Sequence, residues 1–159
     1  QLPQRSAINN ANAYLAAPYG IYRTADGYIA LAMAPIPRLG ELLDCPPLLD
    51  YTDPRSWFDK RDEIKRILAE HLTTRRTEDW LAILEPADVW CADVFDWRRL
   101  REHEAFKVLA WTQEVRRANR ASLVTTRCPI RIDGAILTSS RGAPRLGEDT
   151  EAIAKEFDL

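Results

Sequence analysis

The sequence contains no apolar run that approaches the ~20 residues needed to span a bilayer. Its polar N-terminal stretch, residues 1–12, lacks the apolar core of a secretory signal peptide. Neither sign of charge is in large excess, because 22 basic and 24 acidic residues are interspersed and give a net charge of −2. This balance predicts neither nucleic acid nor a membrane as a partner. We therefore expect a cytoplasmic protein.

Cysteine and histidine are scarce. Cys45, Cys91 and Cys128 are widely spaced, odd in number and form no CxxC pair, a pattern typical of free thiols in a reducing compartment. Only His71 and His103 could supplement them as metal ligands, which disfavours structural zinc. We expect no metal site.

The chain does contain 159 residues of which 46% are apolar, enough for one domain with an ordinary core, or for one domain and an extension. The run Pro18–Ala32, PYGIYRTADGYIALA, predicts a tight β-hairpin, because β-branched and aromatic residues flank a short polar link. We expect Gly27 to adopt a left-handed conformation and to close a type I turn with a glycine bulge. Tyr and Ile side chains should pair across one face of the two strands.

The remaining pattern is typical of an α+β fold with a small antiparallel sheet and three or four helices. Asp53 is a suitable cap for the strongest helix, which apolar residues at helical spacing continue to Leu72. A second helix begins at Thr77, which can cap it, and ends at Pro86; the almost wholly apolar run Val89–Phe95 indicates a strand buried on both faces or a tight core segment. Shorter elements are expected at residues 38–43 and 96–106 (helices), 108–115, 123–126, 130–132 and 135–137 (strands), and 149–157 (a final helix).

Four segments resemble, in the same order, segments of the family III CoA-transferases, the CaiB/BaiF family. They are the hairpin run and the later stretches LTTRRTEDW, PADVWCADV and PRLGEDT. The sequence departs from the family pattern at Asp88, Trp90 and Asp93, where Gly, Pro and Pro are usual, and at Asp149, where His is usual. No glycine is present in residues 9–17, where some members carry a glycine-rich loop.

The resemblance implies a particular domain organisation. Residues 1–17 would be a linker from a large N-terminal domain, residues 18–122 the small domain, and residues 123–159 a C-terminal segment that returns toward the large domain. Because Gln1 is not an initiator Met, we expect the chain to be part of a longer protein. The strands after Leu123 and the helix after Asp149 would then lack their normal neighbour. Intact members are interlocked homodimers.

The resemblance also implies covalent chemistry. In these enzymes a carboxylate attacks an acyl-CoA thioester, and anhydride and enzyme-CoA thioester intermediates carry CoA to another carboxylic acid. The nucleophilic Asp is expected upstream of this chain, so we assign no catalytic residue here. CoA thioester and carboxylic acid are the expected substrates, with no covalently bound cofactor, and the isolated chain should be inactive. The alternatives are part of an α-methylacyl-CoA racemase-like enzyme, which transfers protons, or a stand-alone binding or dimerisation module.

The best candidates for substrate contact are Tyr19, Gly20 and Tyr22, at the start of the hairpin, although packing within the hairpin would also explain them. They are candidates because the resemblance places the start of the small domain near the mouth of the acyl-CoA site. Cys91 could be a nucleophile with His103 as its base, but its apolar flanks Trp90 and Ala92 favour an inert buried thiol.

Other charged groups have two interpretations as well. Asp59, Asp62 and Glu63 are interleaved with basic residues, which favours a solvated helix face over acid–base catalysis. His71 suits a structural or surface role at a helix C-terminus. Two groups of arginines could collect the phosphates of CoA, although the interspersed Asp and Glu residues favour a surface or interdomain role. The groups are Arg98, Arg99 and Arg101, and Arg116, Arg117 and Arg120.

Overall fold

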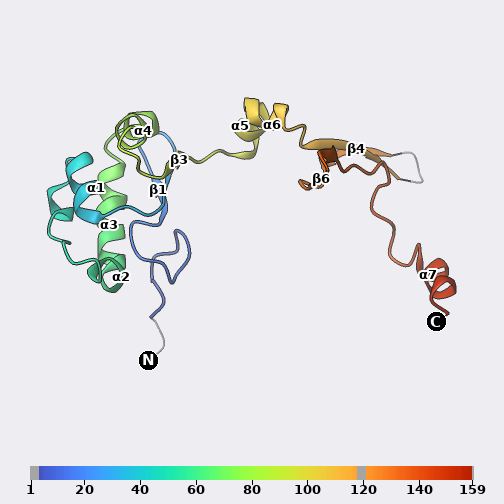
Figure 1. Ribbon diagram of the computed structural model, residues 1–159, viewed down its shortest axis with the longest axis horizontal. Helices are drawn as coiled ribbons and strands as arrows, with labels where there is room; N and C mark the ends of the chain where they lie inside the picture. The colour runs from blue at the N-terminus through green and yellow to red at the C-terminus, as the bar shows by residue number, and fades with distance from the viewer. Residues whose placement is uncertain (1–3, 118–120, 159) are drawn as a thin grey trace. The chain divides into compact units, whose positions relative to one another are not determined.

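The computed structural model describes residues 4–117 and 121–158, and the chain packs as two units, residues 1–95 and residues 96–159 (Figure 1). The division falls between Phe95 and Asp96, whereas the sequence places its boundaries after residue 17 and after residue 122. Those boundaries assign segments to parts of a longer enzyme, and they stay predictions. In the part of the chain that is described, no helix has the length and apolar character needed to cross a membrane.

The first unit contains a three-stranded antiparallel sheet in the order β1-β2-β3. β1 (Gly20–Arg23) and β2 (Tyr28–Leu31) form the expected hairpin, and β3 (Cys91–Asp93) pairs with the other side of β2. Tyr22 lies directly opposite Ile29, and both side chains are buried. The predicted pairing of aromatic and aliphatic side chains is therefore confirmed.

The turn between β1 and β2 differs from the expectation. Left-handed glycine conformations occur at Gly134 and Gly147 but not at Gly27, so the predicted glycine bulge is wrong. Instead the backbone N–H of Gly27 donates to Thr24 Oγ1 at 3.0 Å. A Cβ atom at Gly27 would lie 3.1 Å from the hydroxyl oxygen of Thr77. The close approach of Thr77, rather than a left-handed backbone, is what makes glycine suitable here.

Helices cover one face of this sheet. They are α1 (Ile36–Leu42), the 3₁₀ helix η1 (Pro46–Leu48), α2 (Ser56–Asp59), α3 (Arg61–Leu72) and α4 (Thr77–Leu84). Apolar residues of α3 and α4 pack against the sheet and against α1 and η1 in one core. Its fully buried large side chains include Tyr22, Ile29, Ile36, Leu39, Leu48, Ile64, Leu68, Leu72, Trp80 and Leu84.

The strongest predicted helix is interrupted at Lys60, where φ is −106° and ψ is 21°. Two backbone carbonyls of the preceding turn bind other donors. Trp57 O accepts from the N–H of Ala17 at 2.9 Å, and Phe58 O accepts from the guanidinium of Arg61 at 2.7 Å. These are the acceptors that a continuous helix would use for its own amides. A contact distant in sequence, from Ala17, and a local one, from Arg61, therefore accompany the division of one predicted helix into two.

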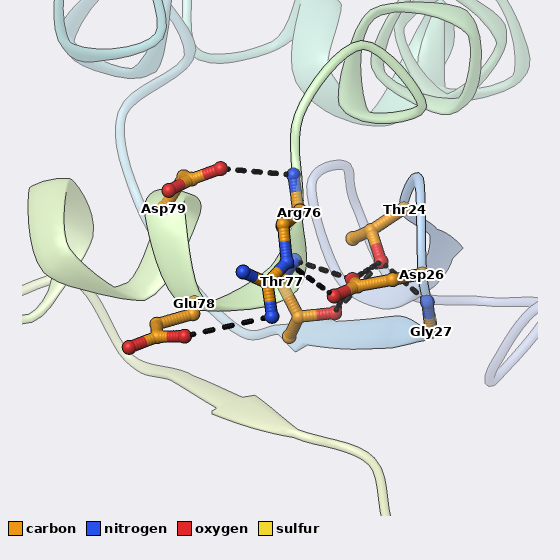
Figure 2. A network of polar contacts seen from close by, with 7 residues as sticks. All are labelled: Thr24, Asp26, Gly27, Arg76, Thr77, Glu78 and Asp79. Atoms are coloured by element: carbon orange, nitrogen blue, oxygen red, sulfur yellow. Dashed lines mark hydrogen bonds and ion pairs between the residues drawn. The ribbon is translucent and has the colours of Figure 1, made fainter.

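A polar network joins the hairpin turn to the start of α4 (Figure 2). The Asp26 carboxylate accepts from the backbone N–H of Thr77 at 2.9 Å and from Arg76 Nε at 2.9 Å. The hydroxyl groups of Thr24 and Thr77 lie 2.7 Å apart in the interior. We expected Thr77 to cap this helix; it is instead the first helical residue, and its amide is capped by Asp26.

β3 is also less buried than its composition indicates. It lies at an edge of the sheet, where Ala92 is exposed and Cys91 is half-buried. The side chain of Trp90, just before the strand, is 65% exposed. The expectation of a strand buried on both faces is therefore wrong, because the sheet has helices on one side only.

The second unit consists of short elements, most of them as predicted. Asp96 Oδ1 accepts from the N–H of Arg99 at 2.7 Å and caps the first helix. The predicted helix then divides at His103, whose Nδ1 accepts from the N–H of Ala105 at 3.2 Å and caps the next one. The elements are α5 (Trp97–Glu102), α6 (Glu104–Val108), β4 (Thr112–Arg116), β5 (Ser122–Thr126), β6 (Arg131–Ile132), β7 (Ala135–Ile136) and α7 (Thr150–Glu156).

This second unit has no apolar core among its described residues. Arg127 is the one buried side chain there, and its guanidinium donates to the carbonyls of Leu109 and Ala110, each at 2.7 Å. Apolar side chains on β5, on β6 and at α7 are exposed, among them Leu123, Val124, Ile132, Ile153 and Phe157.

Candidate functional site

Of the three residues predicted to contact substrate, Tyr22 is buried in the core, whereas Tyr19 and Gly20 line the open side of the sheet. Tyr22 is 2% exposed, and its hydroxyl donates to the carbonyl of Pro18 at 2.6 Å. Burial raises the pKa of Tyr22, so this side chain serves the core. Tyr19 is 37% exposed and lines the open side of the sheet. Gly20 contributes backbone beside it, and a Cβ there would collide with the side chain of Asn10.

The strand register creates a flat apolar floor on the open face. Ile21, Ala30 and Ala92 lie opposite one another across the three strands. Because side chains alternate between the faces of a strand, these three point away from the helices. Two of the three are alanines, so the middle of the face is shallow. It forms a hollow of about 330 Å³ between Tyr19 and Trp90.

A larger apolar cleft adjoins this hollow and shares Tyr19, Ala32 and Trp90 with it. The cleft has a volume of about 680 Å³. The indole N–H of Trp57 donates to Tyr51 O at 2.7 Å, so that polar group is already satisfied. No acidic, basic, cysteine or histidine side chain is found among the residues that line the cleft. Its larger lining residues are Leu15, Pro18, Tyr19, Met33, Trp57 and Trp90.

This arrangement can bind an apolar group but offers no carboxylate, amine, thiol or imidazole to it. A cleft lined mainly by aliphatic and aromatic side chains, with few polar groups, is typical of small-molecule sites. Sequence reasoning missed Leu15, Met33 and Trp90 as parts of this surface. A signal for Trp90 was present, because it replaces the proline that is usual in the family segment.

Cys91 and His103, which the sequence disfavours as a nucleophile and its base, belong to different units. Cys91 belongs to the first unit, and burial raises the pKa of its thiol, which disfavours the reactive thiolate. His103 belongs to the second unit and caps α6. All three cysteines are free, as expected. Among the described residues no cluster of His, Cys, Asp and Glu is suited to hold a metal ion.

The other titratable candidates have structural roles. Asp62 accepts from Ser6 Oγ at 2.5 Å and from the N–H of Ala7 at 2.8 Å, which lowers the pKa of Asp62. This carboxylate therefore fastens the N-terminal segment to α3. Asp59 and Glu63 are exposed, in agreement with a solvated face. His71 Nε2 donates to Leu43 O at 2.8 Å and its ring packs on Trp80.

The two groups of arginines line different cavities. Arg98 and Arg101 lie beside Trp97 in a hollow of about 390 Å³. Arg116 and Arg117 line a groove of about 550 Å³. In the groove they are joined by two arginines that sequence reasoning had not selected, Arg141 and Arg145. Arg120 lies outside the described residues.

Comparisons with known proteins identify the family. The model of CoA-transferase family III matches residues 2–150. A mutant of Rv3272 from Mycobacterium tuberculosis has a similar structure, with a TM-score of 0.63 and 23% identity over 86% of this chain and 39% of that one. A CAIB/BAIF family protein from Brucella suis has a TM-score of 0.58 and 22% identity over 95% of this chain and 40% of that one.

The chain thus spans about two fifths of the length of these solved relatives. No curated protein matches it. At these identities the structures establish the fold, an α+β arrangement of helices and small antiparallel sheets shared with CaiB/BaiF proteins. The match of the family model over nearly the whole sequence establishes more: the chain belongs to CoA-transferase family III.

Proposed function

We propose that this chain is the noncatalytic C-terminal portion of an acyl-CoA:carboxylate CoA-transferase, and that its larger cleft holds the acyl group of a substrate. The family match and the share of the relatives' length that the chain spans support the first part. The apolar cleft beside Tyr19 and Trp90 is the observation that carries the second part.

The lining of the cleft indicates what this chain would contribute to the reaction. Since no carboxylate, amine, guanidinium, thiol or imidazole lines it, this surface contributes binding energy and the exclusion of water. Bond making would belong to a carboxylate in the rest of the enzyme, with an acyl-CoA and a carboxylic acid as substrates and no covalently bound cofactor. The intact enzyme would be an interlocked homodimer in the cytoplasm.

The apolar lining predicts how affinity depends on the ligand. Each buried CH₂ group contributes ~0.8 kcal/mol, which corresponds to about a fourfold gain in affinity. A short polar acid such as acetate gains little from such a surface. A longer alkyl chain can lie in the cleft along Tyr19 and Trp90, with its carboxylate in solvent.

Calorimetric titration of the chain with carboxylates from butyrate to decanoate tests this proposal. We expect affinity to rise with chain length, and Trp90→Ala to weaken decanoate binding by about tenfold. Trp97→Ala is the matched control, because Trp97 is 80% exposed and lies in the other unit. Equal affinity for all chain lengths, or an equal loss in both variants, would contradict an acyl site at the cleft.

A further inference from the structure

The groove lined by arginines lies in the second unit, where a loop runs beside the end of β4. The backbone N–H of Arg116 donates to Ser140 O at 2.8 Å, and the N–H of Gly142 donates to Arg116 O at 2.9 Å. These two hydrogen bonds form a parallel bridge between Arg116 and Arg141. The loop therefore brings arginines that are 25 positions apart in sequence to one place.

Close contact at Gly142 makes this approach possible. A Cβ atom at Gly142 would lie 3.1 Å from Arg117 Cγ and 3.2 Å from Arg116 O. The absence of a side chain lets the loop run directly along the strand end. Arg145, a few residues further along the loop, completes the lining of the groove, whose volume is about 550 Å³.

The charges in the groove are unbalanced. Four arginines line it, against Glu148 as the one acidic residue in the lining. Arg141 makes a two-pronged ion pair with Asp149, at 2.7 and 2.9 Å, and Arg116 Nε lies 3.3 Å from Glu114 Oε1. These pairs hold two guanidinium groups in place.

The other two guanidinium groups, those of Arg117 and Arg145, remain available to bind an anion. Arg117 and Arg145 take part in none of the ion pairs found among the described residues. The Glu148 carboxylate binds a backbone amide and not a guanidinium group: its Oε2 accepts from the N–H of Arg145 at 2.5 Å. Arg117 and Arg145 together carry two positive charges against the single negative charge of Glu148, so the groove favours a further anion.

We propose that this groove binds the phosphate groups of a diphosphate-bearing ligand, with Arg117 and Arg145 as the principal donors. The planar guanidinium fork matches phosphate oxygens in pairs, which gives charge-assisted hydrogen bonds of defined geometry. A diphosphate carries enough negative charge to neutralise both free arginines, whereas a monocarboxylate neutralises one. CoA contains a diphosphate, so if the proposed function holds it is a ligand of this class.

Inorganic pyrophosphate is the probe that tests the groove without relying on the proposed function. In calorimetric titrations of the 159-residue chain at low salt, we expect saturable binding of one pyrophosphate. Each hydrogen bond to a charged group contributes enough that Arg117→Gln with Arg145→Gln should weaken binding by about tenfold or more. All four groove arginines are exposed, and circular dichroism checks that the fold is unchanged.

Two controls make the result specific. Arg98→Gln with Arg101→Gln removes the same charge from the other arginine-lined hollow and should leave pyrophosphate affinity within about twofold of the original. Citrate measures the effect of charge alone and should bind at least tenfold more weakly than pyrophosphate. CoA should compete with pyrophosphate if it is the ligand; a groove that binds pyrophosphate but not CoA serves another diphosphate compound.

The proposal is overturned if pyrophosphate does not bind at millimolar concentration, if both double variants lose affinity equally, or if citrate binds as tightly. None of these outcomes depends on the apolar cleft of the first unit. Failure of the decanoate series with intact pyrophosphate binding would reject the acyl site and leave the anion site standing.

Discussion

The carboxylate of Asp26, in the β1–β2 turn, accepts a hydrogen bond from the backbone N–H of Thr77, the first residue of α4, at 2.9 Å (Figure 2). The amides of a first helical turn have no partner within the helix, so the hairpin supplies one from 51 positions away in the sequence. The hairpin and α4 are thereby fixed to each other.

Replacing Asp26 by asparagine should lower the midpoint of urea unfolding, because the ion pair with Arg76 and the charged cap of α4 are lost. The hydrogen bonds from Thr77 and Arg76 lower the pKa of Asp26 from 3.8 to about 2. Its contribution to stability is therefore present above pH ~4 and is lost as the pH falls toward ~2. Circular dichroism during urea titrations at pH 7 and pH 3 measures both effects.

Glu78→Gln is the control for this variant, since Glu78 is 82% exposed and lies 3.8 Å from Arg76. We expect it to leave the midpoint nearly unchanged. If Asp26→Asn keeps the original midpoint at pH 7 and loses as much stability from pH 7 to pH 3 as the original does, the cap has no energetic role.

Leu68→Ala should destabilise the first unit strongly. Leu68 is fully buried on α3 within the core, and removal of such a side chain costs about 2–5 kcal/mol in the free energy of unfolding. Leu146 is fully exposed, so Leu146→Ala should change the same quantity by less than about 0.5 kcal/mol. Chemical unfolding of both variants compares them, and equal effects would contradict the described core.

Lys65→Met should stabilise the protein. Lys65 is 1% exposed, and its Nζ has no hydrogen-bond partner among the described residues. Burial lowers the pKa of this amine, and a buried charge without a partner opposes folding. A methionine of similar length should raise the free energy of unfolding by about 1 kcal/mol or more.

The matched control for Lys65→Met is Arg66→Met, at the next position of the same helix, where the side chain is exposed. It should change the free energy of unfolding by less than about 0.5 kcal/mol. Destabilisation by Lys65→Met would show that the ammonium group has an interaction that the described contacts do not include.

The three thiols should react in a fixed order. Cys128 is exposed, Cys91 is half-buried and Cys45 is buried. Burial raises the pKa of both Cys45 and Cys91, so less of the reactive thiolate is present on these residues at neutral pH. Alkylation by iodoacetamide followed by peptide mass spectrometry should modify Cys128 first and Cys45 last. Modification of Cys45 before Cys128 would contradict the burial of Cys45.

The sequence alone predicts the hairpin, the ends of α4 and the cap at Asp96, because turn residues, prolines and capping side chains act over a few positions. It fails where distant groups intervene. The carbonyl of Trp57 accepts from the N–H of Ala17, 40 positions away, at the point where a predicted helix divides. Glycine suits position 27 because the Thr77 hydroxyl, 50 positions away, lies close to it, and not because of its own backbone angles.

The candidate sites show the same limit. Tyr19 is predictable from its place at the hairpin. The cleft also needs Met33 and Trp90, and these come to lie beside Tyr19 only because the end of β2 pairs with the chain just before β3. In the groove, Arg116 and Arg117 form a pair in the sequence, whereas Arg141 and Arg145 join them through a loop that the local pattern leaves undefined.

The central claim is that this chain binds substrate and does not carry out the bond-making step. Its most direct test incubates the purified 159-residue chain with an acyl-CoA and a second carboxylic acid and follows new acyl-CoA by liquid chromatography and mass spectrometry. The chain should bind decanoate in the same sample yet form no new acyl-CoA above a protein-free control. Transfer of CoA by this chain would contradict the claim.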